Sequence, residues 1–484
     1  MQELLAWARE VWPLLISALH ISAASWVTVD AVLRKRHAPS VVGWVGLAWL
    51  APIAGAIAYF LLGINRIQRS ASALGRPLPA APGVAGPDAG LELAHAADPA
   101  HPGLAGLVRL GNRVTARPLL AGNRIEPLRN GDTAFPAMLE AIDGATRSVA
   151  LQSYIFDNDF AGHEFRDALR RACERGVAVR VLIDDVGSRY TRPPMVEGLH
   201  RAGVPVAAFL PTRVPRLFQY ANLRNHRKIL VVDGRTGFTG GMNIREGNWL
   251  SRQPKDPVRC IHFRIEGPVV ADMQETFATD WAFTTGEQLQ GEDWFPPLAE
   301  SGPVAARGVP DGPDANIDNL PQLLIGALSV AMRSVRVVSP YFLPDDGLLR
   351  ALEVAALRGV QVDVVLPGRS NVPLMDWAMT PQLPWLINAG CRVWRLPEPF
   401  NHTKLCVVDG VWSLVGSTNW DARSLRLNFE YNLECYDRAL AGRLDGIVDS
   451  MLAEATLENR DALLERPFPA RLRDGLTRLL SPYL

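Results

Sequence analysis

The stretch that decides the fold is NHTKLCVVDGVWSLVGSTNWDARSLRLNFE, residues Asn401–Glu430. It places His402, Lys404 and Asp409 in the spacing H-x-K-x-x-x-x-D, and a glycine-rich turn that ends at Asn419 follows. The apolar run between the lysine and the aspartate predicts a buried strand that ends in an Asp-Gly turn. Residues two apart on a strand face the same side, so the histidine and the lysine project together.

The same pattern occurs earlier in the chain as NHRKILVVDGRTGFTGGMN, residues 225–243. Here His226, Lys228 and Asp233 keep the spacing, and Asn243 ends the glycine-rich turn. Two copies of a strand, an Asp-Gly turn and a glycine-rich turn indicate shared chemistry rather than chance. We expect each aspartate to belong to the catalytic set with the histidine and lysine of its motif. A role in the turn alone is the alternative, because Asp-Gly is a common turn pair.

The segments around the two motifs repeat as well. The β-rich run Ser148–Phe156 precedes a helical stretch and the buried run Val177–Ile183, and the same order returns at Ser334–Phe342 and Val360–Leu366. This repetition indicates an internal duplication of one α/β unit with strands buried on both faces. We expect a first domain over residues 107–300 and a second over residues 301–484.

Two long apolar runs stand at the N-terminus, Val11–Leu33 and Val41–Ile64. At about 1.5 Å per residue each could cross a hydrocarbon core of roughly 30 Å, which predicts two membrane helices in an anchor over residues 1–70. A buried hairpin in a soluble protein is the alternative. Full crossing and a hairpin that bends near Pro52 and returns to the same face both remain open. Residues 71–106, rich in Ala, Pro and Gly, are expected to form a flexible linker.

Composition excludes some classes of function. The 484 residues carry 50 basic and 50 acidic side chains, so no overall basic charge favours a nucleic-acid partner. Five scattered cysteines without a C-x-x-C pair argue against a disulfide framework or a zinc site and suit a cytosol-facing domain. The tail, residues 466–484, aligns leucines on one helical face, which fits either ordinary packing or contact with a membrane surface.

A pair of histidines with two lysines and two asparagines suits phosphoryl transfer that requires no metal or other cofactor. One imidazole can attack phosphorus while the other protonates the leaving alcohol and later deprotonates the acceptor hydroxyl. The lysines and asparagines can hold the non-bridging oxygens and the charge that develops on them. Since each half supplies one residue of each kind, we expect one site at the boundary between the halves.

The sequence resembles the phospholipase D superfamily and, within it, the bacterial cardiolipin synthases. Besides the doubled motif, the resemblance rests on the paired N-terminal runs and on the following matches: YFLPD at Tyr341–Asp345, SLRLNFE at Ser424–Glu430 and SPYL at the end. It implies two tandem phospholipase D-like domains that form one active site at their interface. Two N-terminal membrane helices precede these domains in the chain. It also implies transfer of a phosphatidyl group from one phosphatidylglycerol to another at the bacterial inner membrane, with the catalytic part in the cytoplasm. Hydrolysis by a phospholipase D and transfer to another headgroup lipid remain alternatives.

The resemblance also implies roles for single residues. His226 corresponds to the nucleophile and His402 to the acid and base, while the phosphate-binding positions are Lys228, Lys404, Asn243 and Asn419. Glu430 matches the carboxylate that orients the second-half histidine. The first-half carboxylate is replaced by Cys260, which leaves Asp256 or Glu266 to orient His226, or leaves that histidine less activated.

The approach to the first motif, Arg213–Arg227, mixes arginines with Phe218 and Tyr220. It fits a mobile rim that attracts anionic headgroups at a lipid surface. An ordinary solvated loop is the alternative.

Overall fold

The computed structural model describes residues 2–34, 38–51, 53–62, 86, 88–211, 223–313 and 316–481. It divides into two compact units, Met1–Leu74 and Gly75–Leu484. Most of the expected rim and residues 71–85 of the expected linker lie outside the described residues.

The described part of the first unit contains the helices α1 (Gln2–Arg34), α2 (Ala38–Leu50) and α3 (Ala54–Leu62). Among the described residues, only the Val11–Arg34 part of α1 is long and apolar enough to cross a membrane. At about 1.5 Å per residue, α2 would span only about 20 Å. The prediction of a second spanning helix over residues 41–64 is therefore wrong.

The physical reason lies in the sequence near Pro52. Proline lacks a backbone N–H and its ring clashes with the carbonyl four residues earlier, so it interrupts a helix. Ile53 takes a positive φ of 62°, which turns the chain, and α3 then packs against α2. The approach is close enough that a Cβ added at Gly55 would lie 2.3 Å from the Leu47 carbonyl oxygen. This chain reversal requires a glycine at that contact.

The second unit is built on one mixed sheet whose described strands run in the order β20-β14-β13-β11-β16-β17-β19-β10-β1-β9-β7-β6-β2-β3-β4. Its first-half strands are β1 (Leu120–Arg129), β2 (Ser148–Ser153), β3 (Ala178–Asp184), β4 (Val206–Phe209), β6 (Ile229–Val232), β7 (Thr236–Gly240) and β9 (Ile261–Glu266). Its second-half strands are β10 (Val304–Asp311), β11 (Ser334–Val338), β13 (Gln361–Pro367), β14 (Arg392–Leu396), β16 (Leu405–Val408), β17 (Trp412–Gly416), β19 (Asn428–Tyr436) and β20 (Thr456–Leu457).

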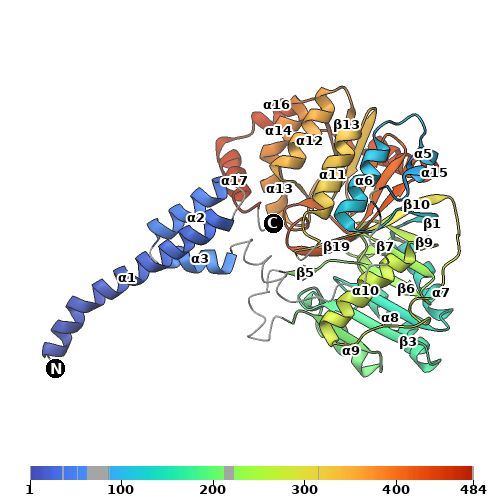
Figure 1. Ribbon diagram of the computed structural model, residues 1–484, viewed down its shortest axis with the longest axis horizontal. Helices are drawn as coiled ribbons and strands as arrows, with labels where there is room; N and C mark the ends of the chain where they lie inside the picture. The colour runs from blue at the N-terminus through green and yellow to red at the C-terminus, as the bar shows by residue number, and fades with distance from the viewer. Residues whose placement is uncertain are drawn as a thin grey trace. The chain divides into compact units, whose positions relative to one another are not determined.

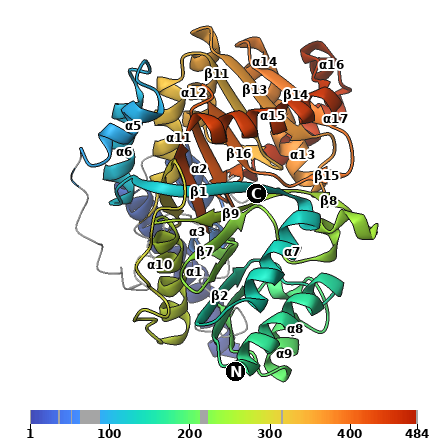
Figure 2. The same ribbon diagram turned by 90° about the vertical axis from the view of Figure 1, so that its right-hand side faces the viewer.

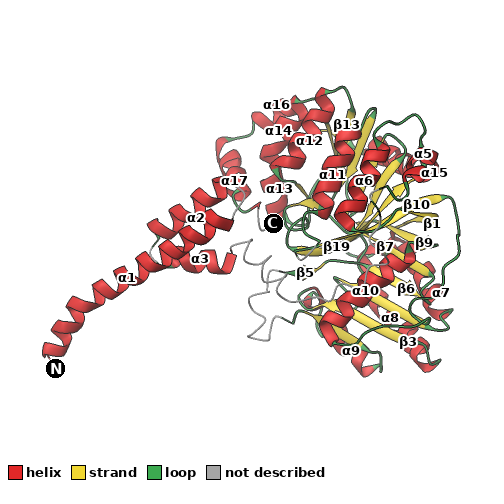
Figure 3. Cartoon of the chain, in the orientation of Figure 1, coloured by secondary structure: helices red, strands yellow, loops and turns green. Residues whose placement is uncertain are grey.

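Helices pack on both faces of this sheet (Figures 1 and 3). Those of the first half are α7 (Asn130–Asp143), α8 (Phe160–Glu174), α9 (Met195–Arg201) and α10 (Val270–Thr285). Those of the second half are α11 (Asn319–Val330), α12 (Asp346–Leu357), α13 (Pro373–Met379), α14 (Leu383–Asn388), α15 (Arg438–Glu454), α16 (Arg460–Leu464) and α17 (Phe468–Arg478). Strands β2 and β13 are buried along nearly their whole length, as the continuous apolar runs predicted.

The duplication is visible in the strand order. From the antiparallel contact of β1 with β10, equivalent strands follow outward in the same succession on each side. Figure 2 shows β9, β7 and β2 of the first half on one side of β1 and β16, β11 and β13 of the second half on the other. The parallel pair of β2 and β3 in the first half corresponds to the parallel pair of β11 and β13 in the second. The predicted α/β duplication is confirmed, and the two halves share one sheet within a single compact unit.

The expected linker contains regular structure in its second part. Helix α5 (Leu91–Ala97) lies inside it, and α6 (Leu104–Thr115) begins before its end. Leu104 and Leu107 of α6 are buried in the same core as Leu323 of α11, so this helix belongs to the core of the second half. The linker prediction is wrong there because apolar side chains spaced along α6 outweigh the local Ala, Pro and Gly content.

The aspartate of each Asp-Gly turn binds the backbone at the start of a central strand, which is β2 in the first half and β11 in the second. Asp233 and Asp409 have φ values of 52° and 54°, and the following glycines also take positive φ, as hairpin turns of this kind require. The Asp409 carboxylate accepts hydrogen bonds from the backbone N–H groups of Met332, Arg333 and Ser334, at 2.7–2.8 Å. The Asp233 carboxylate makes the same bonds to the backbone before β2.

We expect Asp409→Ala to lower the free energy of unfolding by roughly 2–4 kcal/mol, because it leaves several backbone donors without their acceptor. Burial acts to raise the pKa of Asp409, but these donors lower it overall. The stabilisation is therefore present at neutral pH and lost as pH falls through that lowered pKa. Urea unfolding of the purified protein measures the effect, with the exposed Asp293→Ala as control. A change below about 1 kcal/mol would contradict the assignment.

Candidate active site

The first-half histidine is held by a strand of the second half. The two-residue strand β5 (Arg224–Asn225) pairs in parallel with Asn428 and Phe429 at the start of β19. The backbone N–H of His226 continues this pairing and donates to the Phe429 carbonyl at 2.9 Å. His226 therefore stands beside Glu430, and its Nδ1 lies 2.9 Å from one carboxylate oxygen and 3.1 Å from the other.

The second-half histidine is held in the same way by the first half. Strand β15 (Phe400–Asn401) pairs in parallel with β8 (Val258–Arg259), and the His402 N–H donates to the Arg259 carbonyl at 2.7 Å. The residue after Arg259 is Cys260, which therefore takes the place beside His402 that Glu430 takes beside His226. The Nδ1 of His402 contacts the Gly241 carbonyl at 2.9 Å.

These two strand pairings between the halves give each histidine a different partner from the expected one. Glu430 was expected to orient His402, and Cys260 was expected to replace the partner of His226; both assignments are wrong. Each half supplies the orienting position for the histidine of the other half, which the order of motifs along one chain does not reveal. Glu266, one of the alternatives for orienting His226, accepts hydrogen bonds from Arg264 instead.

The Glu430 carboxylate is buried and surrounded by donors. The Ser417 hydroxyl donates to one of its oxygens and the Asn428 amide to the other. Burial raises the pKa of Glu430 to about 7, against the lowering effect of Lys228 and of these donors. In the first motif Gly241 stands where the second has Ser417, so the first copy lacks both the hydroxyl and the carboxylate.

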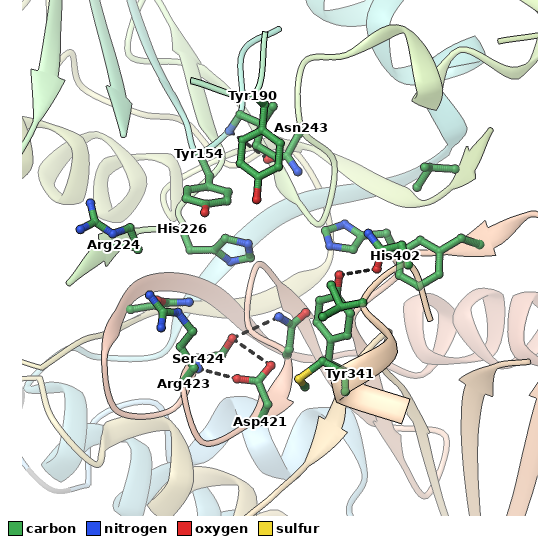
Figure 4. Close-up of a pocket in the computed structure, with 18 of the residues that line it drawn as sticks. Tyr154, Tyr190, Arg224, His226, Asn243, Tyr341, His402, Asp421, Arg423 and Ser424 are labelled. Atoms are coloured by element: carbon green, nitrogen blue, oxygen red, sulfur yellow. Dashed lines mark hydrogen bonds between the residues drawn. The ribbon is translucent and has the colours of Figure 1, made fainter. Parts of the chain in front are cut away.

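The surroundings of both imidazoles favour the neutral form. Burial lowers the pKa of His226 and of His402 well below the usual value, and the charges of Lys228 and Lys404 lower each further. A neutral His226 donates its Nδ1–H to Glu430 and presents the lone pair of Nε2. His402 donates its Nδ1–H to a backbone carbonyl, a neutral acceptor. In Figure 4 both rings project into the same cavity.

The two motif lysines are buried and repeat one geometry. The Nζ of Lys228 donates to the His226 carbonyl at 2.7 Å, and the Nζ of Lys404 donates to the His402 carbonyl at 2.8 Å. Burial lowers the pKa of both amines, that of Lys404 to about 7. An anion bound in the cavity would favour their charged forms.

The cavity has a volume of about 390 Å³ and is lined by both halves. Of the expected residues, His226, His402, Asn243 and Asn419 line it, whereas Lys228 and Lys404 are not among its described lining residues. Its further polar residues are Tyr154, Tyr190, Arg224, Arg245, Asn248, Tyr341, Asn371, Asp421, Arg423, Ser424 and Asn428 (Figure 4). Burial raises the pKa of Asp421 to about 6.

Part of this lining had a usable signal in the sequence. Tyr154 comes directly after β2, and Tyr341 comes three residues after the end of β11; these are the first buried parallel strands of the two halves. Ligands of parallel sheets gather at the carboxyl ends of the strands, so polar residues at those ends were candidates. Asn371 and Arg423 lie on loops between elements and had no such signal.

The two motif aspartates have a structural role at their turns. Neither Asp233 nor Asp409 is among the described residues that line the cavity, and both carboxylates bind backbone N–H groups at the turns described above. The structure thus favours the alternative of a turn role for these two aspartates. They hold one end of β6 and of β16, and the histidine and lysine of each motif lie directly before the other end of the strand.

Comparisons with known proteins agree with this geometry. Residues 138–281 and 324–452 match a family described as "Cardiolipin synthase, PLD-like domain". The cardiolipin synthase of Geobacillus kaustophilus is 31% identical over 97% of this chain and 94% of its own length. The major cardiolipin synthase ClsA of Bacillus subtilis is 34% identical over 75% of this chain and 76% of its own length.

Among solved structures, the phosphatidylserine synthase of Haemophilus influenzae has the same fold, with a TM-score of 0.63 and 15% identity. The match covers 78% of this chain and 100% of that one. Family matches in both halves and relatives that align along most of the sequence agree with the paired motifs in the cavity. The chain therefore belongs to the bacterial cardiolipin synthases of the phospholipase D superfamily.

Proposed function

We propose that this protein is a cardiolipin synthase that transfers a phosphatidyl group between two phosphatidylglycerol molecules in one site formed by both halves. The observation that carries the proposal is the pairing in one cavity of two histidines with unlike partners. His226 has a buried carboxylate behind its Nδ1, whereas His402 has only a carbonyl. Such a pair suits a division into nucleophile and acid–base.

In the first step the Nε2 of His226 attacks the phosphorus of the first phosphatidylglycerol. The P–N bond forms as the bond from phosphorus to the headgroup glycerol oxygen breaks, and the Nε2–H of a protonated His402 gives that oxygen its proton. The anionic phosphodiester favours this protonated form of His402. Glu430 stabilises the positive charge that the attacking imidazole acquires.

In the second step the headgroup hydroxyl of another phosphatidylglycerol enters. His402, now neutral, takes the hydroxyl proton while the oxygen attacks phosphorus, and the P–N bond breaks to restore His226. Lys228, Lys404, Asn243 and Asn419 bind the non-bridging oxygens throughout. No step requires a metal or another cofactor.

The membrane assignment follows from the same proposal. We infer that Val11–Arg34 anchors the chain in the bacterial cell membrane and that Gly75–Leu484 works on its cytoplasmic side. The apolar helix and the free cysteines support this placement. The balanced net charge favours lipid over nucleic acid as the substrate.

The direct test uses the purified full chain in detergent with phosphatidylglycerol alone, and mass spectrometry of the lipids. Cardiolipin and free glycerol in equal amounts are expected. Phosphatidic acid with glycerol but without cardiolipin would make water the acceptor and the protein a phospholipase D. Product only after another headgroup lipid is added would overturn phosphatidylglycerol as acceptor.

We expect His226→Ala and His402→Ala each to lower the transfer rate by about a thousand-fold or more, because each removes a group used in both steps. The initial rate of cardiolipin formation measures the loss. His200→Ala, on the exposed end of α9, serves as the matched control and should leave the rate unchanged. Near-normal activity in either motif variant would refute the mechanism of two histidines.

We expect Cys260→Asp to preserve or raise activity and to move the alkaline limb of the pH–rate profile to higher pH. A carboxylate at this place favours protonated His402, so the pKa of the histidine rises and the acid form survives to higher pH. The pH dependence of kcat/KM provides the measurement. A collapse of activity in a folded variant would show that residue 260 does not occupy the orienting position.

A further inference from the structure

Helix α17 has its apolar residues on the outside. Phe468, Leu472 and Leu476 are 73%, 49% and 57% exposed, while Asp474 and Thr477 on the opposite side are almost fully buried. A helix that packs on a domain normally buries its leucines and exposes its carboxylates. This inversion indicates that the exposed face has a partner other than the described core.

The orientation of α17 is fixed by the contacts of its buried side with α13. The buried Asp474 carboxylate accepts hydrogen bonds from Arg466 and Arg473, at 2.5–2.9 Å. The helix also packs against α13 along its length, as Figure 1 shows. A rotation that buried the leucines would expose Asp474 and Thr477 and would separate Arg473 from Trp377 of α13, so the outward leucine face belongs to the fold.

Arginines and tryptophans border the leucine face. At 3.6 residues per turn, Arg471 and Arg478 lie along one edge of the stripe and Arg473 along the other. The Arg473 guanidinium lies 4.2 Å from the ring centre of Trp377, and that of Arg478 lies 4.7 Å from the half-exposed Trp385. Leucine with flanking tryptophan and arginine is the composition of helices that lie in an anionic membrane surface.

Apolar side chains also lie beside the cavity that contains the two histidines. Val372 and Met375, at the start of α13, line that cavity. Val372 and the neighbouring Leu374 are 36% and 41% exposed, so apolar surface is also present beside the cavity. Because α17 packs against α13, the leucine face and this part of the cavity wall lie on neighbouring helices.

We propose that the outer face of α17, together with the start of α13, is a membrane-docking surface for a bilayer that contains anionic phospholipid. Its leucines and Phe468 enter the boundary of the acyl chains, and its arginines contact lipid phosphates. Docking places the cavity next to the headgroups of that bilayer. The role in substrate access rests on the proposed function, whereas docking itself does not.

The first test measures the environment of one position. The full chain with Cys173→Ser and Leu476→Cys carries a fluorophore at 476, since the other described cysteines are buried. It is reconstituted in vesicles of phosphatidylcholine and phosphatidic acid, with or without nitroxide-labelled lipid. Quenching by the nitroxide lipid is expected at position 476. It is not expected at Leu357→Cys, because Leu357 is 72% exposed at the end of α12, which precedes β13, whereas α13 follows β13.

An aqueous quencher that reaches position 476 as readily as position 357 would overturn docking. A shielded fluorophore that nitroxide lipid does not quench would also overturn it, because another copy of the chain or its own N-terminal helices would then cover the face. Neither readout requires turnover, so the failure of docking and the failure of the proposed function are distinguishable.

The second test concerns substrate access. Leu472→Glu/Leu476→Glu should lower the rate on long-chain phosphatidylglycerol in vesicles at least tenfold. The rate on a short-chain phosphatidylglycerol dissolved as monomers should stay within twofold, because the cavity is unchanged. Leu357→Glu is the matched control and should change neither rate. Equal loss on both substrates, or no loss on either, would contradict the role of the surface in substrate access.

Discussion

The hydrogen bond between His226 and Glu430 depends on a crossing of the chain between its two halves. The bond forms because β5 of the first half pairs with β19 of the second, which sets the histidine beside the carboxylate. The matching pair of β15 with β8 sets His402 against the first half. Each histidine is therefore correctly placed only when the two halves are assembled, and the shared sheet through β1 and β10 holds them in that register.

The two copies of the motif have the same reactive groups but differ in the residues that orient the histidine. Behind His226 stand Glu430 and the Ser417 hydroxyl, whereas behind His402 stand Cys260 and the Gly241 carbonyl. A carboxylate stabilises an imidazolium and therefore suits the histidine that becomes covalently bound. A histidine with a neutral acceptor releases its proton more readily, which suits an acid that must become a base within one turnover.

Much of the fold followed from local patterns. The continuous apolar runs predicted β2, β3, β11 and β13 because strands covered on both faces are apolar throughout. The doubled spacing also predicted which histidines and asparagines line the cavity. The orienting partners were assigned to the wrong histidines because a pairing between strands far apart in sequence leaves no local trace. The prediction of a second membrane helix was also wrong, because mean hydropathy does not show that the chain turns near Pro52.

The same limit explains α6 and the motif aspartates. Leu104 and Leu107 became recognisable as core residues only once α11 lay beside them. The sequence allowed either a catalytic or a turn role for Asp409, and the backbone donors before β11 favour the turn role. Both cases concern contacts across more than seventy residues, which residue spacing alone does not predict.

The central claim is that His226, oriented by Glu430, forms the covalent bond to phosphorus. The most direct measurement treats His402→Ala with a phosphatidyl ester of nitrophenol, a leaving group that needs no acid. The account predicts a burst of one nitrophenol per active site, with a phosphatidyl group mapped to His226 by mass spectrometry at neutral pH. A group mapped to His402 in the His226→Ala protein, and none in the His402→Ala protein, would contradict it.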